Sequence, residues 1–388
     1  MNENISKLNH LDCCGCAVCA FSCPVGAISM ILERDGFFYP KVDEGKCIGC
    51  GKCVAACPEI TPVSKNIINK YYIAQSKDKE VLMKSSSGAA FYELARYVID
   101  QGGFVSGCVL DEHDQMPVHI VTNRISDLRR MQGSKYVQSK ISSDVYGKIQ
   151  ELVGNKKRVL FCGTPCQISA LRHAVKDDKN LIPVDLICHG IGSPGAYKEH
   201  IDRIGESLGE KVKGVSFRSK KGYTYPDNYH LEVKGQSKRY DRSIWRDKFF
   251  ATFADSRFLR ESCYRCKYAT VERQGWISLG DYSVEQNTDA FDRKLGLNLI
   301  CVNTVDGEKL LSDISSRLIL HELTKAPVKQ NLKRPEPRPQ IRNRYNQADF
   351  QSENTVENRK VMRLLFSDYI KSFLPKTLKK KIKKLLRK

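Results

Sequence analysis

Beyond Pro62, apolar and polar positions follow two alternating periods along the chain. Short apolar runs are typical of strands, whereas apolar residues that return every three or four positions are typical of helices. The first pattern predicts strands over residues 71–74, 104–110, 118–122, 158–162, 182–187, 212–217, 229–233 and 297–303. The second predicts helices over residues 89–100, 144–153, 166–175 and 194–208. This mixture indicates an α+β fold with a mixed α/β domain over residues 66–325.

Cysteines dominate the pattern of residues 1–62. Two runs read C-x2-C-x2-C-x3-C-P: Cys13, Cys16, Cys19, Cys23 and Cys47, Cys50, Cys53, Cys57. This spacing is typical of two 4Fe–4S clusters, in which the fourth cysteine of each run binds the other cluster. We therefore assign Cys13, Cys16, Cys19 and Cys57 to the first cluster, and Cys47, Cys50, Cys53 and Cys23 to the second. The segment is a bacterial-type ferredoxin domain with electron transport as its expected role.

Structural zinc is the alternative for these thiols, but zinc sites usually pair two C-x2-C units at a longer gap. Cys14, an additional thiol between two ligands, receives no role. The apolar segments 25–32 and 36–42 predict small strands or turns.

Four further cysteines could form a third site. Pro165 suits a first helical turn, where Cys166 would lie near the positive end of the helix dipole. Cys263 and Cys266 form a C-x2-C pair, and Cys188 follows a predicted strand. Together they predict a four-thiolate site for a third 4Fe–4S cluster or a zinc ion, although Cys166 alone could be structural.

Ser85, Ser86, Ser87 and Gly88 precede a predicted helix. Serines in this position usually cap the helix. The same hydroxyl and N–H groups also bind phosphates. Taken alone, these residues favour helix capping over phosphate binding.

The chain has 388 residues and 16 cysteines, and no apolar stretch reaches the roughly eighteen residues of a membrane span. Residues 13–32 are fairly apolar, but their cysteines fall at ligand spacing and only Lys7 precedes them, so we do not expect a signal peptide. Without export the thiols stay reduced, which favours metal or redox chemistry over disulfides. The expected localisation is cytoplasmic.

Basic residues outnumber acidic ones by 64 to 44, giving a net charge of +20. Residues 326–388 predict a basic linker and an amphipathic tail, with one helix that ends near Pro375. A second helix would carry its apolar side chains on one face of an otherwise basic surface: Leu378, Ile382, Leu385 and Leu386. Such a helix can lie peripherally on the inner face of an anionic membrane. A frayed, solvated tail is the equal alternative. We expect no nucleic-acid binding, because no aromatic residues interleave the lysines.

Several stretches of the main domain resemble the beta subunit of the coenzyme F420 hydrogenases and dehydrogenases. They occur in the expected order at residues 85–88, 133–139, 163–167, 185–190, 217–218, 262–266, 279–281 and 299–304. The resemblance implies two parts, residues 66–155 and 156–325, and an N-terminal ferredoxin domain is a common companion. It implies a flavoprotein that binds FAD beside a 4Fe–4S cluster held by Cys166, Cys188, Cys263 and Cys266. The implied flavin-site residues are Ser85, Ser86, Ser87, Gly88, Gly133, Ser134, Lys135, Tyr136 and Thr164.

The implied activity is that of an iron–sulfur flavoprotein oxidoreductase. It would move electrons between a two-electron donor, such as reduced coenzyme F420 or an anionic metabolite, and a ferredoxin or other redox partner protein. Lys135, Arg218, Lys220 and Lys221 are candidates to receive the anionic molecule, although each such residue is more often a solvated surface charge. Departures at Gly222-Tyr223 and Tyr282-Ser283 leave the substrate open.

Three rivals remain at this point. One is a reductase of a metabolite or sugar intermediate, and another is an electron-transfer subunit without its own substrate, serving a partner enzyme in surface polysaccharide biosynthesis. The third is a redox sensor that binds clusters but no flavin. No catalytic acid or base is assigned; His189 is the nearest candidate, and hydrogen bonding near the cluster suits it better.

Overall fold

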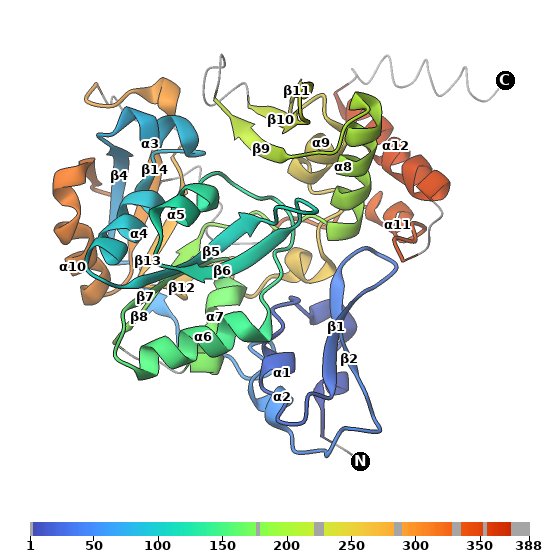
Figure 1. Ribbon diagram of the computed structural model, residues 1–388, viewed down its shortest axis with the longest axis horizontal. Helices are drawn as coiled ribbons and strands as arrows, with labels where there is room; N and C mark the ends of the chain where they lie inside the picture. The colour runs from blue at the N-terminus through green and yellow to red at the C-terminus, as the bar shows by residue number, and fades with distance from the viewer. Residues whose placement is uncertain are drawn as a thin grey trace.

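The computed structural model describes residues 3–175, 179–220, 229–282, 289–327, 335–351 and 355–373. A small N-terminal module projects below a large sheet domain, and the last helices lie beside a second group of helices and strands (Figure 1). No helix among the described residues is both long and apolar enough to cross a membrane.

The N-terminal module is built around its cysteine loops. Two short helices, α1 (Val18–Phe21) and α2 (Lys52–Ala55), follow these loops, and β1 (Ile28–Leu32) pairs antiparallel with β2 (Phe38–Val42). The turns η1 (Ile5–Lys7) and η2 (His10–Asp12) precede the first loop. The module is ferredoxin-like, and the strands expected over residues 25–42 are present.

An eight-stranded mixed sheet forms the centre of the large domain, in the order β15-β4-β14-β13-β8-β7-β5-β6. Its strands in chain order are β4 (Lys70–Ser76), β5 (Phe104–Leu110), β6 (Pro117–Thr122), β7 (Val159–Gly163), β8 (Leu181–Leu186), β13 (Ile277–Asp281), β14 (Asn298–Val302) and β15 (Leu318–Leu323). The four central strands β13, β8, β7 and β5 are parallel, and antiparallel strands flank them. Ligands of such sheets bind beyond the carboxyl ends of parallel strands.

Helices cover both faces of this sheet. They are α3 (Lys79–Lys84), α4 (Ala90–Asp100), α5 (Ile125–Met131), α6 (Ser143–Gly154), α7 (Pro165–Val175) and α10 (Val305–Asp313). Because successive strand side chains point to opposite faces, Leu160 of β7 packs with the α4 core and Phe161 with the α6–α7 core. Cys16 and Val18 of the N-terminal module join the second of these cores.

A second lobe contains α8 (Pro194–Leu208), α9 (Lys248–Ala254) and a small sheet of β9 (Gly214–Ser219), β10 (His230–Lys234) and β11 (Arg239–Ser243). Its core is rich in aromatic residues and includes α11 (Arg342–Tyr345) and α12 (Thr355–Ser372). The remaining short elements are β3 (Asn66–Ile67), β12 (Glu272–Arg273), η3 (Glu261–Arg265), η4 (Arg293–Leu295) and η5 (Ser315–Arg317).

The strands and helices expected from periodicity are present, with ends that differ by a few residues. The C-terminal region differs more: we expected a basic linker ahead of the amphipathic helix, but Arg342 and Tyr345 of α11 are fully buried. The expected second basic helix around Leu378 and Ile382 lies outside the described residues, as do Lys221, Gly222-Tyr223 and Ser283. Membrane contact therefore stays a prediction.

Candidate functional site

The cysteines of the N-terminal module gather at its centre. Cys19, Cys53 and Cys57 share one buried cluster with Ile5, and Cys23 packs against it. Burial raises the pKa of Cys57, and the nearby thiol of Cys13 adds to this rise. The structure therefore brings Cys57 to the first cysteine run.

The second run lies at the outer end of the module. Burial raises the pKa of Cys53, and the neighbouring Cys23 contributes to the rise. Cys50 is exposed, as is the adjacent Ile48. The backbone N–H of Ala27 donates to Cys23 Sγ at 3.2 Å, the kind of hydrogen bond that tunes a cluster potential. The structure thus places Cys23 with the second run.

Three buried side chains of the large domain hold the loop between Cys13 and Cys16. Arg260 donates to Cys13 O at 2.6 Å, and Gln138 Nε2 donates to Gly15 O at 3.1 Å. The hydroxyl of Tyr146 donates to Cys16 O at 2.8 Å. Gly15 has a φ of +70°, and a Cβ there would lie 2.1 Å from Gln138 Nε2, so only glycine fits. These three hydrogen bonds attach the loop to the large domain.

A second set of cysteines meets at the carboxyl ends of the central strands. Cys166, Cys188, Cys263 and Cys266 line one small cavity, of about 60 Å³. Burial raises the pKa of Cys188 to about 12, and the neighbouring Cys166 and Cys266 add to the rise. Burial and Cys188 likewise raise the pKa of Cys263. The expected third site is therefore assembled in space from distant segments of the chain.

The chemistry of this donor set suits an iron–sulfur cluster. Four thiols are the donor set typical of 4Fe–4S or zinc sites, and the same cavity is also lined by Asp12, Glu59, His189 and Glu336. Among the described residues, no three His, Cys, Asp or Glu side chains converge closely enough to hold a single ion. A 4Fe–4S cluster is instead held at its four corners by one cysteine each.

A buried ion pair fixes the strand end that carries Cys188. Asp185 accepts from Arg273 Nη2 at 2.6 Å, and from the backbone N–H groups of Gln274 and Gly275 at 2.9 and 2.8 Å. Arg273 also donates to Leu186 O at 3.0 Å. Both members of the pair are buried, and they hold β8 against the segment that precedes β13.

A larger cleft of about 530 Å³ adjoins the cysteine cavity. The two share part of their walls: Cys14, Thr164, Cys166, Cys188, His189, Gly190 and Ile191. Eight of the nine expected flavin-site residues line the cleft: Ser85, Ser86, Ser87, Gly133, Ser134, Lys135, Tyr136 and Thr164. Gly88 lies behind the wall, where a Cβ would come within 2.2 Å of Ala74 O.

Hydroxyl groups and a helix start form one wall of this cleft. Ser86 Oγ accepts from Ser134 N at 2.6 Å and Ser134 Oγ at 3.0 Å. Ala89, with a φ of 67°, starts α4 beside them, and its backbone lies at the cleft. None of these serines caps α4 by a side-chain hydrogen bond, so the capping role favoured from the sequence is wrong.

The basic side chains that we expected to receive an anionic molecule form hydrogen bonds and ion pairs within the protein. Lys135 Nζ lies within hydrogen-bonding distance of four carbonyls at the end of α5, which its three N–H groups share: those of Arg130, Met131, Gln132 and Gly133. Burial lowers the pKa of Lys135 to about 8. Lys220 Nζ donates to three more: Leu82, Ser87 and Leu295. Arg218 lines the cleft, with Nη1 2.5 Å from Asp281 Oδ2 and its guanidinium 4.1 Å from the centre of the Tyr229 ring.

Residues that we did not predict also line the cleft. His119 of β6 is 4% exposed, stacks on Phe161, and its Nδ1 has no hydrogen-bond partner. Burial lowers the pKa of His119 to about 3, so the ring is neutral. The sequence feature that could have identified His119 is its position on the buried face of a predicted strand. His189 Nε2 lies 3.0 Å from Ser256 Oγ, consistent with its expected hydrogen-bonding role.

Comparisons with known proteins show which families the two parts of the chain resemble. Residues 156–326 match the family described as the C terminus of the coenzyme F420 hydrogenase/dehydrogenase beta subunit, and residues 12–60 match the 4Fe–4S dicluster domain. A coenzyme F420-dependent sulfite reductase of Methanocaldococcus jannaschii is 27% identical over 264 residues, which cover 61% of this chain and 39% of that protein. A structure of the F420-reducing [NiFe] hydrogenase complex from Methanosarcina barkeri aligns with a TM-score of 0.46 and 17% identity, over 79% of this chain and 92% of that one.

Proposed function

Because residues 156–326 belong to the coenzyme F420 hydrogenase/dehydrogenase beta-subunit family and residues 12–60 to the 4Fe–4S dicluster domains, we propose that this chain is an iron–sulfur flavoprotein oxidoreductase. It would exchange electrons between a two-electron donor or acceptor and one-electron carriers. The chain covers 39% of the length of its sulfite reductase relative, so the activity of that whole protein is not carried over.

The shared wall of the two cavities is the observation that carries this proposal. The cysteine cavity and the larger cleft meet at Thr164, Cys166 and Cys188. A cofactor in the cleft would therefore lie next to a cluster held by Cys166, Cys188, Cys263 and Cys266. Two-electron chemistry could take place on one side of this wall and one-electron transfer on the other.

The cleft fits FAD in size and in chemistry. A volume of about 530 Å³ lies within the roughly 300–1,000 Å³ typical of cofactor sites. The start of α4, with Ser86 and Ser134, offers hydroxyl and N–H groups for a diphosphate. The unpartnered Nδ1 of His119 offers one neutral hydrogen-bonding atom to a ring. A bound flavin would supply a group that accepts two electrons together and releases them singly.

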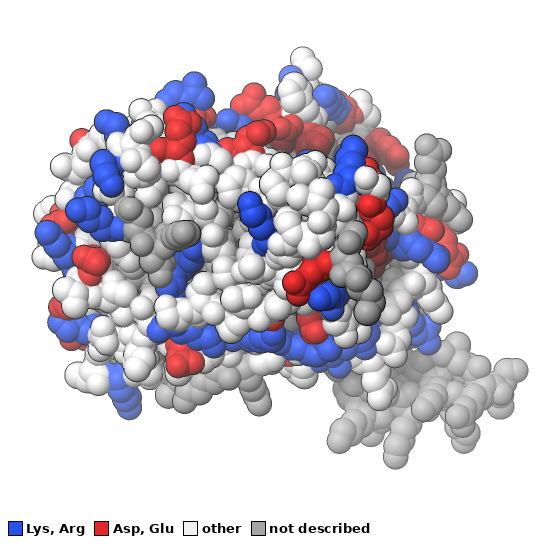
Figure 2. All heavy atoms as spheres, turned by 90° about the horizontal axis from the view of Figure 1, so that it is seen from below, with Lys and Arg blue, Asp and Glu red and all other residues white. Residues whose placement is uncertain are grey.

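The outermost cysteines support transfer to a protein partner. Cys50 and Ile48 are exposed at the tip of the iron–sulfur module. The face seen from below, toward which the module projects, is uncharged over much of its centre and carries both signs of charge around it (Figure 2). A ferredoxin or another redox protein would exchange electrons with the cluster of Cys47, Cys50, Cys53 and Cys23.

An electron-transfer subunit without its own substrate is the second candidate. The observation that favours it is the engagement of Lys135 and Lys220 by backbone carbonyls, which leaves neither ammonium directed at an anionic substrate. Arg218 at the cleft wall is then the remaining described cation of the expected set.

Anaerobic mixing of the purified, flavin-loaded chain with reduced coenzyme F420 separates the two candidates. The oxidoreductase predicts oxidation of the coenzyme and bleaching of the iron–sulfur absorbance by the chain alone. If dithionite bleaches the clusters while reduced coenzyme F420 and reduced nicotinamides do not, the chain is instead an electron-transfer subunit without its own substrate.

A further inference from the structure

Thr164 precedes α7, on the wall that the cysteine cavity and the larger cleft share. Its carbonyl accepts from the backbone N–H of Ile168 at 3.0 Å, and its own N–H donates to Gln167 Oε1 at 2.9 Å. This is one half of a capping box, in which the third helical residue reaches back to the residue that precedes the helix. Gln167 Nε2 donates to Ser139 Oγ at 2.9 Å, which fixes the orientation of the amide. The backbone of Thr164 is therefore held in place without its own side chain.

The Thr164 hydroxyl does not form the other half of this cap in the part of the chain that the structure describes. A threonine in this position usually accepts from the backbone N–H two or three residues further on. Thr164 Oγ1 lies instead 3.1 Å from the sulfur of Cys166, an expected ligand of the third cluster. By contrast, Thr304 at the start of α10 accepts from Gly307 N at 3.0 Å, as an ordinary cap does. The Thr164 hydroxyl is thus directed at a sulfur rather than at the helix backbone.

We infer that Thr164 is a positioning residue for electron transfer, whose hydroxyl donates to the Cys166 sulfur of the third cluster and raises the potential of that cluster. This rests on the proposed function, because it needs a cluster at the third site. A cysteine binds iron as the thiolate, which has no proton and can only accept a hydrogen bond. The hydroxyl is then the donor of this contact.

The effect on the potential follows from charge. A cluster gains one negative charge when it is reduced, so an O–H donated to its ligand sulfur stabilises the reduced state more than the oxidised one. The hydroxyl therefore favours the third cluster as the acceptor of an electron that leaves the cleft. No covalent bond forms or breaks, and the electron that the cluster gains is one that a donor in the cleft loses. Since Thr164 has one hydroxyl proton, its oxygen can only accept a hydrogen bond from a molecule in the cleft.

The test uses the full chain with its clusters, as the wild type, Thr164→Val and Thr164→Ser. Valine keeps the shape of the side chain but removes the hydroxyl proton, whereas serine keeps that proton. Cluster potentials are measured by anaerobic EPR-monitored redox titration, in which the signal of the third cluster is the one that Cys188→Ala loses. We expect Thr164→Val to keep its iron and to move only the third potential, to a more negative value. Thr164→Ser should stay close to the wild type because its hydroxyl also donates.

Thr304→Val is the matched control. It removes an ordinary threonine cap from α10, whose hydroxyl contacts a backbone N–H and not a sulfur. We expect it to lower the midpoint of thermal unfolding and to leave all three cluster potentials unchanged. This separates a loss of helix capping from a loss of the hydrogen bond to Cys166.

Three results would overturn the inference, and they differ in their reach. An unchanged third potential in Thr164→Val, with about twelve irons bound, removes the hydrogen bond to the cluster and leaves the proposed function intact. A third potential that shifts as far in Thr164→Ser or Thr304→Val assigns the effect to helix packing, and the proposed function again stands. About eight irons in the wild type remove the third cluster, and with it the proposed function as well.

Discussion

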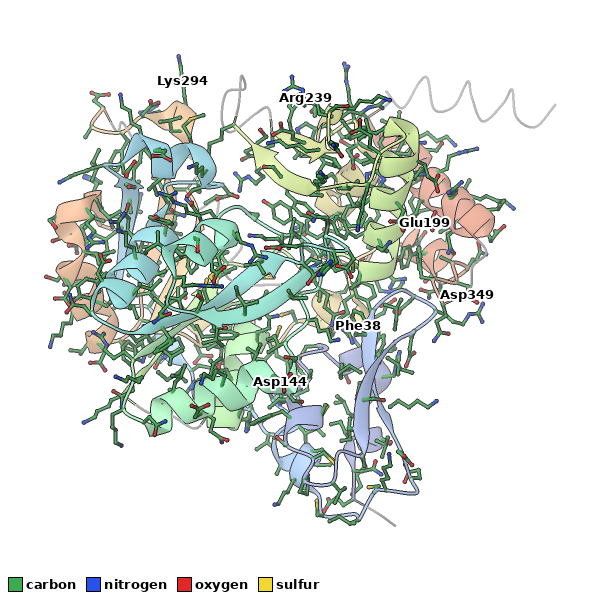
Figure 3. All side chains as sticks on the ribbon, in the orientation of Figure 1. Phe38, Asp144, Glu199, Arg239, Lys294 and Asp349 are labelled. Atoms are coloured by element: carbon green, nitrogen blue, oxygen red, sulfur yellow. The ribbon has the colours of Figure 1, made fainter. Side chains whose placement is uncertain are left out.

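Arg260 joins three segments that are far apart in the sequence. It is 0% exposed and donates to Cys13 O, Phe38 O and Gln138 Oε1 at 2.6, 3.0 and 3.2 Å, and it lies 4.0 Å from the centre of the Tyr39 ring. Phe38 lies where the hairpin of the small module meets the large domain (Figure 3). The guanidinium therefore ties the first cluster loop to the main body.

Arg260→Met should release this attachment while keeping most of the side-chain volume. Each acceptor left without a partner in a buried site costs about 1–3 kcal/mol. We expect faster proteolysis between the two domains and a lower denaturation midpoint in urea under anaerobic conditions. Arg239→Met, at an exposed position labelled in Figure 3, is the matched control and should change neither. Equal effects of the two substitutions would contradict the proposed attachment of the two domains by Arg260.

His119 predicts a pH dependence of stability. Its pKa is about 3 in the folded chain, because of burial, against about 6.5 when unfolded. The folded pKa is depressed, so above pH 6.5 neither state is charged; as the pH falls below 6.5 only the unfolded chain binds the proton. Wild-type stability should fall, relative to His119→Gln, by about 1.4 kcal/mol per pH unit below 6.5. Paired urea titrations at pH 7.5 and 5.5 measure this. A constant difference would contradict the buried neutral ring.

Ligand spacing predicts the eight cysteines of the N-terminal module, since three thiols of each run reach iron within a short loop. Cys166 and Cys188 have no such spacing and were predicted from strand ends and from the family resemblance. Cys14 and His119 had no such signature. Both line the cleft, and their places there depend on the packing of segments that are far apart in the sequence. The engagement of Lys135 by the carbonyls of α5 likewise depends on how the helix ends, which composition does not determine.

At the scale of elements, periodicity predicted three of the four central strands, β5, β7 and β8, and the helices α4, α6 and α7, because each of these carries a run of buried apolar residues. β13 was missed as a strand although its Gly280-Asp281 end belonged to a recognised motif. Its run is only five residues long and carries Ser278 inside the sheet, where Arg273 and Asn303 donate to the hydroxyl. A buried polar residue interrupts the apolar run from which a strand is predicted, and its hydrogen-bond partners lie elsewhere in the sequence.

Helix α12 is part of the second lobe's core. Val361, Met362 and Leu365 pack their side chains in the aromatic cluster of that lobe, and Tyr369 of the same helix is also buried. Arg257 pairs with Asp368, and so ties the end of α9 to this helix. The buried face of α12 therefore packs against the rest of the second lobe.

Two neighbouring leucines of α12 test this packing. Leu365 is 0% exposed and Leu364 is 37% exposed. Leu365→Ala should reduce the free energy of unfolding by about 2–5 kcal/mol, because it opens a cavity in the core. Leu364→Ala should cost less than about 1 kcal/mol, since its side chain faces solvent. Similar losses in the two variants, measured by urea denaturation, would show that α12 does not pack as described.

Across the whole molecule, three groups of cysteines and one cleft lie in a continuous order. The second run packs with the first, Cys14 of the first run lines both the cysteine cavity and the cleft, and the third group shares a wall with the cleft. This order suits one-electron transfer between a docked protein and a two-electron cofactor. It depends on the docking of two domains, which neither domain's sequence pattern specifies alone.

The iron and flavin content of the anaerobically purified chain tests this account most directly. We predict about twelve irons per chain, from three clusters of four, together with one FAD. Cys188→Ala should lose about four of these irons and keep the signals of the other two clusters. About eight irons, one zinc and no flavin in the wild type would contradict the account and leave a two-cluster electron carrier.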